Sequence, residues 1–128
     1  MKNDRLRNME LKYFTISEFD SPDLKDSGDK MDLLFLLRLD QCRDLAGIPF
    51  KITSGYRTEE HNKKIKGVKD SSHTKGLAAD ILASTSQERY IIINAAIKVG
   101  FKRIGIGSTF IHLDTDTSKT QEVMWDYY

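Results

Sequence analysis

Residues 54–80 read SGYRTEEHNKKIKGVKDSSHTKGLAAD and contain two of the three histidines of the chain. The end of this segment carries the pattern S-x-H-x-x-G-x-A-x-D, which runs from Ser71 to Asp80. The third histidine, His112, lies much later, in the compact segment FIHLD at 110–114. We expect His73, Asp80 and His112 to meet in space around one metal ion, with the rest of the chain as their scaffold.

Histidine and carboxylate side chains are typical ligands of catalytic zinc, which takes three of them and leaves one position for water. His73 and Asp80 are seven residues apart, and Gly76 between them favours a loop leading into a strand. In that arrangement His73 folds back toward Asp80 at the edge of the sheet, and a strand at 110–114 presents His112 on one face. Spacing alone leaves other roles open, because each residue could instead bond to local backbone or lie on the surface.

A long helix is expected from about Lys30 to Ala46, with Asp29 as its N-cap and Gly47 as its C-terminal stop. Its apolar residues form a broad stripe, which is typical of a helix packed on a sheet. The stripe includes Met31, Leu34, Leu37 and Leu45, and the opposite face holds Arg38, Asp40, Gln41 and Asp44.

Capping signals predict two further helices. Thr58 can cap a short helix at 59–62. Thr85 and Glu88 form a capping box for a helix at 87–99. The inner face of that helix is expected to hold Ile91, Ile92, Ala95, Ala96 and Val99.

Short apolar runs between turn residues predict the strands. Residues 108–109 join two of these runs as a hairpin, and a last edge strand is expected near Trp125. The runs are FKIT at 50–53, LAADIL at 77–82, RIGIG at 103–107 and FIHLD at 110–114. We therefore expect an α+β fold, with a small, largely antiparallel sheet and helices packed on one side.

The chain reads as one domain over residues 1–128, with a loose segment or edge strand at 1–12 and a single helical turn within residues 13–23. Twenty basic and nineteen acidic residues leave a net charge of +1, so no overall field favours nucleic acid or an anionic membrane. The single cysteine, Cys42, excludes a disulfide framework and is expected to be buried and inert. The charged N-terminus lacks the features of a signal peptide.

Several spaced motifs resemble one known family. They are S-G-Y-R at 54–57, H-N at 61–62, S-x-H-x-x-G-x-A-x-D-I at 71–81 and H-x-D at 112–114. The chain resembles the zinc D-Ala-D-Ala carboxypeptidases, which share their fold with the hedgehog signalling domain, and in particular their short members from bacteriophages and bacteria. The similarity extends from Phe14 to Trp125. It implies the hedgehog/DD-peptidase fold and Zn²⁺ bound by His73, Asp80 and His112.

The resemblance also implies roles for other residues. Arg57 would stabilise the oxyanion of a tetrahedral intermediate, although a structural salt bridge to the helix at 58–62 is an alternative. Tyr56 and Ser72 would add hydrogen bonds to the substrate. In several relatives the general base is an acidic residue three positions before the last histidine, and Thr109 stands there. We expect Asp114, which shares a strand face with His112, to act as the base or to orient that histidine, with Asp116 as another candidate base.

The expected function is therefore that of a zinc metallopeptidase that cleaves peptidoglycan stem peptides, as a carboxypeptidase or an endopeptidase. A monomeric phage endolysin or virion-associated hydrolase would suit the chain. It would remain in the host cytoplasm until lysis or travel with other virion proteins, and would act in the cell wall. The alternative is a zinc-stabilised binding or virion structural domain without turnover. Neither nucleic acid nor a membrane is expected as a partner.

Overall fold

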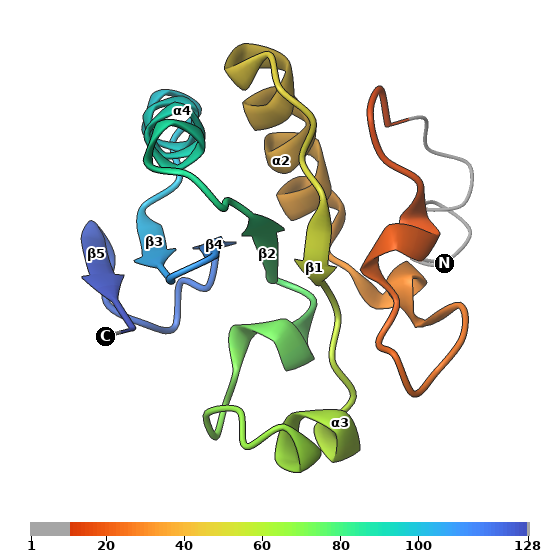
Figure 1. Ribbon diagram of the computed structural model, residues 1–128. Coiled ribbons are helices and arrows are strands. Elements are labelled where there is room, and N and C mark those ends of the chain that lie inside the picture. Colours follow the sequence, from red (N-terminus) through yellow and green to blue (C-terminus); the bar gives the residue numbers. More distant parts are fainter. Residues whose placement is uncertain (1–10, 128) are drawn as a thin grey trace.

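A computed structural model describes residues 11–127 of the chain (Figure 1). The fold is of the α+β class, because its helices pack against a mostly antiparallel sheet. In chain order the elements are η1 (Ile16–Phe19), η2 (Ser27–Lys30), α2 (Leu33–Ala46), β1 (Ile52–Ser54), α3 (Glu59–Lys64), η3 (Ser72–Lys75), β2 (Ala78–Leu82), α4 (Ser86–Lys98), β3 (Arg103–Ile106), β4 (Phe110–Asp114) and β5 (Val123–Asp126), where η denotes a 3-10 helix.

The five strands form one sheet in the order β1-β2-β4-β3-β5. β2 pairs antiparallel with both β1 and β4, and β3 pairs antiparallel with β4. β3 and β4 form the predicted hairpin, which Gly107 N closes by donating to the carbonyl of Phe110. β5 is an edge strand, as expected, but it pairs with β3 in the parallel direction. The sheet is thus largely antiparallel, as predicted.

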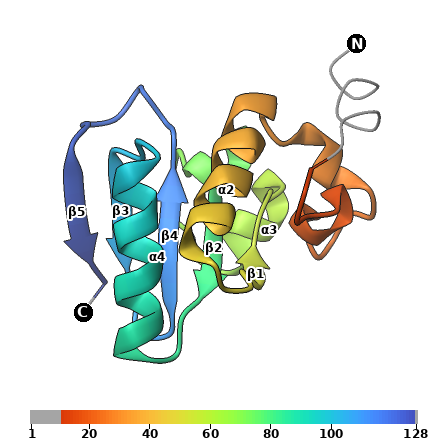
Figure 2. The same cartoon turned by 90° about the horizontal axis from the view of Figure 1, so that it is seen from above.

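The two faces of the sheet differ in character, because successive side chains of a strand point to opposite sides. One face is covered by α2 and α4, which pack on each other, while the shorter α3 lies on the other side (Figure 2). The helix-covered face supplies core residues, namely Ala79, Ile81, Ile104, Ile111 and Leu113. The opposite face of β2 and β4 carries Asp80, His112 and Asp114, so the sheet separates the core from the polar side chains.

The predicted start of α2 is wrong by about three residues. Its N-cap is Asp32, whose carboxylate accepts a hydrogen bond from Phe35 N, and not Asp29. Asp29 instead lies in η2. The carboxylate of Asp20 stabilises this turn by accepting a hydrogen bond from Gly28 N. The predicted C-terminal stop is confirmed, since Gly47 adopts a left-handed conformation with φ of 71°.

The buried face of α2 also differs from the predicted stripe. Met31 is buried, but Leu34, Leu37 and Leu45 are exposed by 74%, 40% and 52%. The face that enters the core consists of Phe35, Leu36, Leu39 and Cys42. Leucine occurs all around the first two turns of this helix, so apolar content alone did not identify the inner side.

The remaining helix predictions hold in outline. α4 has the predicted capping box of Thr85 and Glu88, and Ile92, Ala95 and Ala96 are buried as expected, whereas Ile91 and Val99 are half-buried. Thr58 caps α3 by accepting a hydrogen bond from His61 N. Cys42 is fully buried, and burial raises the pKa of its thiol to about 12, so the thiol is inert as predicted. Within residues 11–127 no helix is long and apolar enough to cross a membrane.

At the N-terminus, the predicted helical turn is η1, and its Phe19 is completely buried. The predicted loose segment at 1–12 lies almost wholly outside the described residues. Its last two residues are held in place, because Leu11 packs against the core and Lys12 N donates to Asp40.

Two leucines of α2 test the corrected helix face. Leu36→Ala is expected to lower the free energy of unfolding by about 2–5 kcal/mol, because it opens a cavity in the core. Leu34→Ala, a change of the same chemistry at an exposed site, should alter it by no more than about 0.5 kcal/mol. Urea denaturation of both variants measures the difference. Equal losses would contradict the assigned face.

Candidate metal centre

Asp80 and His112 face each other across two neighbouring strands. They are direct partners in the antiparallel register of β2 and β4. His112 Nδ1 lies 2.9 Å from Asp80 Oδ1. Both strands are interior to the sheet, so the expectation that His73 meets Asp80 at a sheet edge is wrong. The interior position makes the pair rigid, because each strand is bonded on both sides.

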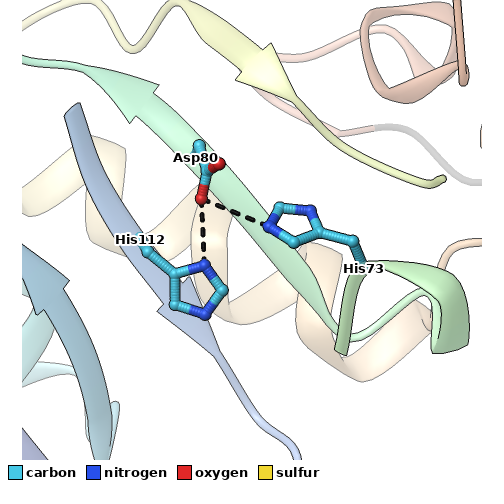
Figure 3. A group of neighbouring side chains, drawn as sticks. All are labelled: His73, Asp80 and His112. Atoms are coloured by element: carbon cyan, nitrogen blue, oxygen red, sulfur yellow. Dashed lines mark hydrogen bonds and ion pairs between the residues drawn. The ribbon is translucent and has the colours of Figure 1, made fainter. Parts of the chain in front are cut away.

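His73 approaches this pair from η3, the turn that precedes β2. Ser71 caps the turn by accepting from His73 N, and Gly76 ends it in a left-handed conformation with φ of 72°. A Cβ at Gly76 would lie 2.4 Å from the carbonyl oxygen of Lys30, so this close approach requires glycine. The result places His73 Nε2 at 3.3 Å from Asp80 Oδ1 (Figure 3).

The three side chains form a group that could hold one metal ion. Each offers one ligand atom, and these atoms all lie within 4.8 Å of one another. Ligands of a tetrahedral zinc ion, with bonds of about 2.0–2.1 Å, lie roughly 3.3 Å apart. The spacing and the two-nitrogen, one-carboxylate donor set therefore fit zinc, and the group is buried on the polar face of the sheet.

The second nitrogen of each imidazole has an acceptor that orients the ring. His73 Nδ1 lies 2.8 Å from the carbonyl of Gly55, which can only accept, so the proton belongs on Nδ1 and Nε2 keeps a lone pair. His112 Nε2 lies 2.7 Å from Asp114 Oδ2. Such outer acceptors orient ligand histidines in metal sites and increase their basicity. Asp114 is itself fixed by Arg103, whose Nε donates to Oδ1 over 2.8 Å.

The surroundings shift the protonation of all three candidate ligands. Burial lowers the pKa of His73. Burial acts the same way on His112, but its hydrogen bonds to Asp114 and Asp80 outweigh burial and raise the pKa of His112. Burial would raise the pKa of Asp80, yet hydrogen bonds from His112 and His73 hold that pKa well below its usual range. Asp80 is thus ionised, the form in which a carboxylate binds a cation.

Arg57 lies beside the group and also contacts α3. Its Nη2 is 3.6 Å from Asp80 Oδ2, its Nε donates to Ser54 Oγ, and its Nη1 donates to Asn62 Oδ1. Burial lowers the pKa of the guanidinium, which still carries its charge. Arg57 thus points toward the candidate group, as expected. Its contact with the helix is a hydrogen bond to the neutral side chain of Asn62, whereas its ion pair is with Asp80 of β2.

The other predicted residues lie at different distances from the centre. Ser72 lines the cleft above it, whereas Tyr56 packs partly against the core and is not among the lining residues. The backbone carbonyl of Thr109 accepts a hydrogen bond from the backbone N–H of Ala83. Asp116 also lies outside the lining, because its carboxylate accepts hydrogen bonds from Ser72, Lys75 and Ser118.

The cleft above the three residues has a volume of about 480 Å³. One wall contains Phe110, Trp125 and Tyr127, and Lys119 also lines it. No motif in the sequence marks these residues as part of the site. Trp125 and Tyr127 are two residues apart, which indicates that they share one face of a strand. Only the parallel pairing of β5 with β3 brings that face next to His112, whose ring centroid lies 5.6 Å from that of Trp125.

The fold and the centre define an α+β domain with a three-residue candidate metal site at the base of a cleft. The family model described as Peptidase M15 matches residues 12–114, which include all three candidate ligands. The chain therefore belongs to the peptidase M15 family, and the resemblance to the zinc D-Ala-D-Ala carboxypeptidases is confirmed. A search of curated proteins gave no significant match to the chain. The matched span ends before β5.

The ligand assignment can be tested on the three histidines of the sequence. His73→Ala and His112→Ala are each expected to abolish tight zinc binding, because each removes one of three donors. His61→Ala is the matched control, since His61 lies in α3 and outside the group. Zinc content after dialysis measures binding, and added zinc should raise the melting temperature of wild type and His61→Ala only. Full zinc content in either of the first two variants would refute the assignment.

Proposed function

We propose that the chain is a zinc-dependent peptidase that hydrolyses peptide bonds of peptidoglycan stem peptides. The observation that carries the proposal is the convergence of His73, Asp80 and His112 at the base of a cleft in a chain of a peptidase family. Bound by these three residues, zinc would supply a Lewis acid that polarises the scissile carbonyl and lowers the pKa of water to about 7.

Arg57 and Asp114 are the residues we assign to charge and proton handling. The guanidinium of Arg57, held by Ser54 and Asn62, would stabilise the negative charge that develops on the carbonyl oxygen. Asp80 and Asp114 are the carboxylates among the cleft-lining residues. Because Asp80 is a ligand candidate, Asp114 would take one proton from the attacking water. It would pass that proton to the leaving amine nitrogen as the C–N bond breaks.

The charge of the cleft supports an acidic peptide as substrate. Four cationic side chains line it, and one of its two carboxylates is paired with Arg103 while the other lies near Arg57. The cations are Arg57, Lys66, Arg103 and Lys119. Stem peptides of peptidoglycan carry free carboxylates, so they match this field, and Ser72 is placed to add a hydrogen bond. A monomeric phage lysin or virion-associated hydrolase remains the biological setting we propose.

A second candidate function is a zinc-stabilised binding domain without turnover. It is favoured by Thr109, which stands where several relatives have an acidic base and cannot accept a proton from water. The two functions share the metal site and differ only in hydrolysis, so a rate measurement separates them.

Hydrolysis of purified peptidoglycan by the zinc-loaded chain is the direct test. We expect release of free amino acid or new amino termini, loss of release with a chelator, and recovery on adding zinc back. His61→Ala should match wild type, and His73→Ala should be inactive. No release at any pH from 5 to 9, with stoichiometric zinc bound, would leave the binding domain as the function.

Two substitutions of Asp114 separate proton transfer from histidine orientation. Asp114→Asn retains an oxygen that accepts from His112 Nε2 but cannot take a proton, so we expect normal zinc content and a roughly 10²–10⁴-fold lower kcat. Asp114→Ala removes the acceptor as well, and zinc affinity should fall by about 10–100-fold. Comparable activity of wild type and Asp114→Asn would show that Asp114 only orients His112, and Asp116→Asn would then be examined in the same assay.

A further inference from the structure

Tyr127 belongs to the wall of the cleft although it lies beyond the matched family span. It follows β5 directly, and its backbone N donates to the carbonyl of Ile106 over 3.2 Å. Its side chain lines the same cleft as His73, Asp80 and His112, and the residue is 51% exposed. A molecule in the cleft can therefore reach it.

Gly105 explains how the tyrosine comes so close to the centre. Gly105 pairs with His112 on one side and with Trp125 on the other. A Cβ at this position would lie 2.8 Å from both the Cε2 and the hydroxyl oxygen of Tyr127, and 2.9 Å from Trp125 Cε2. The ring and hydroxyl of Tyr127 thus lie over the strand that neighbours His112, in space that any side chain at 105 would fill.

Neighbouring rings hold Tyr127 in this position. Its centroid is 5.1 Å from that of Phe110 and 6.3 Å from that of Trp125. The phenol of a tyrosine is protonated at neutral pH, so it can donate a hydrogen bond. The hydroxyl lies beside Gly105, the register partner of His112, so this end of the side chain is close to the candidate ligand group.

We propose that Tyr127 is a catalytic residue whose hydroxyl donates a hydrogen bond to the scissile carbonyl oxygen as that oxygen becomes negatively charged. The inference rests on the proposed peptidase function and adds a second donor to Arg57. The two donors come from distant parts of the chain, since Arg57 precedes α3 and Tyr127 follows β5. A preformed donor aimed at developing charge lowers the barrier more than it strengthens substrate binding.

Tyr127→Phe tests this role, because it removes the hydroxyl and retains the ring that packs on Phe110. With peptide release from a stem peptide as the assay, we expect kcat to fall roughly 10²-fold while KM changes by less than about twofold. Zinc content and melting temperature should match wild type. Tyr90→Phe is the control, because Tyr90 is 71% exposed on α4, the helix on the far side of the sheet.

Binding of a phosphinate peptide, a tetrahedral mimic of the transition state, gives a readout that needs no turnover. Tyr127→Phe should weaken its binding by about the same factor as kcat and leave binding of an uncleaved substrate analogue unchanged. Wild-type kcat in Tyr127→Phe, or a loss found only in KM, would overturn the role of Tyr127. If wild type binds the phosphinate but cleaves no peptide, the peptidase proposal fails. Unchanged phosphinate affinity in Tyr127→Phe would separately refute the contact between the Tyr127 hydroxyl and the oxyanion.

Discussion

The antiparallel pairing of β2 with β4 is the constraint on which the candidate centre depends. It sets Asp80 directly opposite His112, on the face of the sheet that the long helices leave uncovered. A shift of one residue in this register would turn one of the two side chains into the core. The core residues Ile81 and Ile111, which are also direct partners, oppose such a shift, because they would lose their burial between the sheet and the helices.

Burial of so many polar groups on one face requires that they satisfy one another. His112 lies between Asp80 and Asp114, Asp114 is paired with Arg103, and Asp80 is flanked by His73 and Arg57. Among residues 11–127, no buried side-chain nitrogen or oxygen lacks a hydrogen-bond partner. A fully satisfied network of this kind is rigid, and it holds the imidazoles at fixed positions for a cation.

The cleft joins segments that are far apart in the sequence. The turn of η3 brings His73, the sheet interior brings Asp80 and His112, and the parallel edge strand β5 brings Trp125. The span that matches the peptidase M15 family includes all three candidate ligands. Of the cleft-lining residues, Lys119, Trp125 and Tyr127 lie outside the matched span, whereas Phe110 lies within it.

The sequence by itself was sufficient to predict the α+β class, the hairpin and the capping box of Thr85 and Glu88, because these depend on residues close in the chain. The three candidate ligands followed from spaced motifs that resemble those of a known family, because spacing alone left other roles open. The sequence failed at the inner face of α2, where leucines surround the helix and only packing selects Leu36 over Leu34. Nothing in the sequence indicated that Tyr127 lines the cleft, because a tyrosine near the end of the chain has no local pattern that assigns it to a site. Only the tertiary structure decided that β5 runs parallel to β3 and that Gly105 leaves room for the tyrosine beside His112. Pairing between distant strands depends on how the whole sheet packs, which no local pattern specifies.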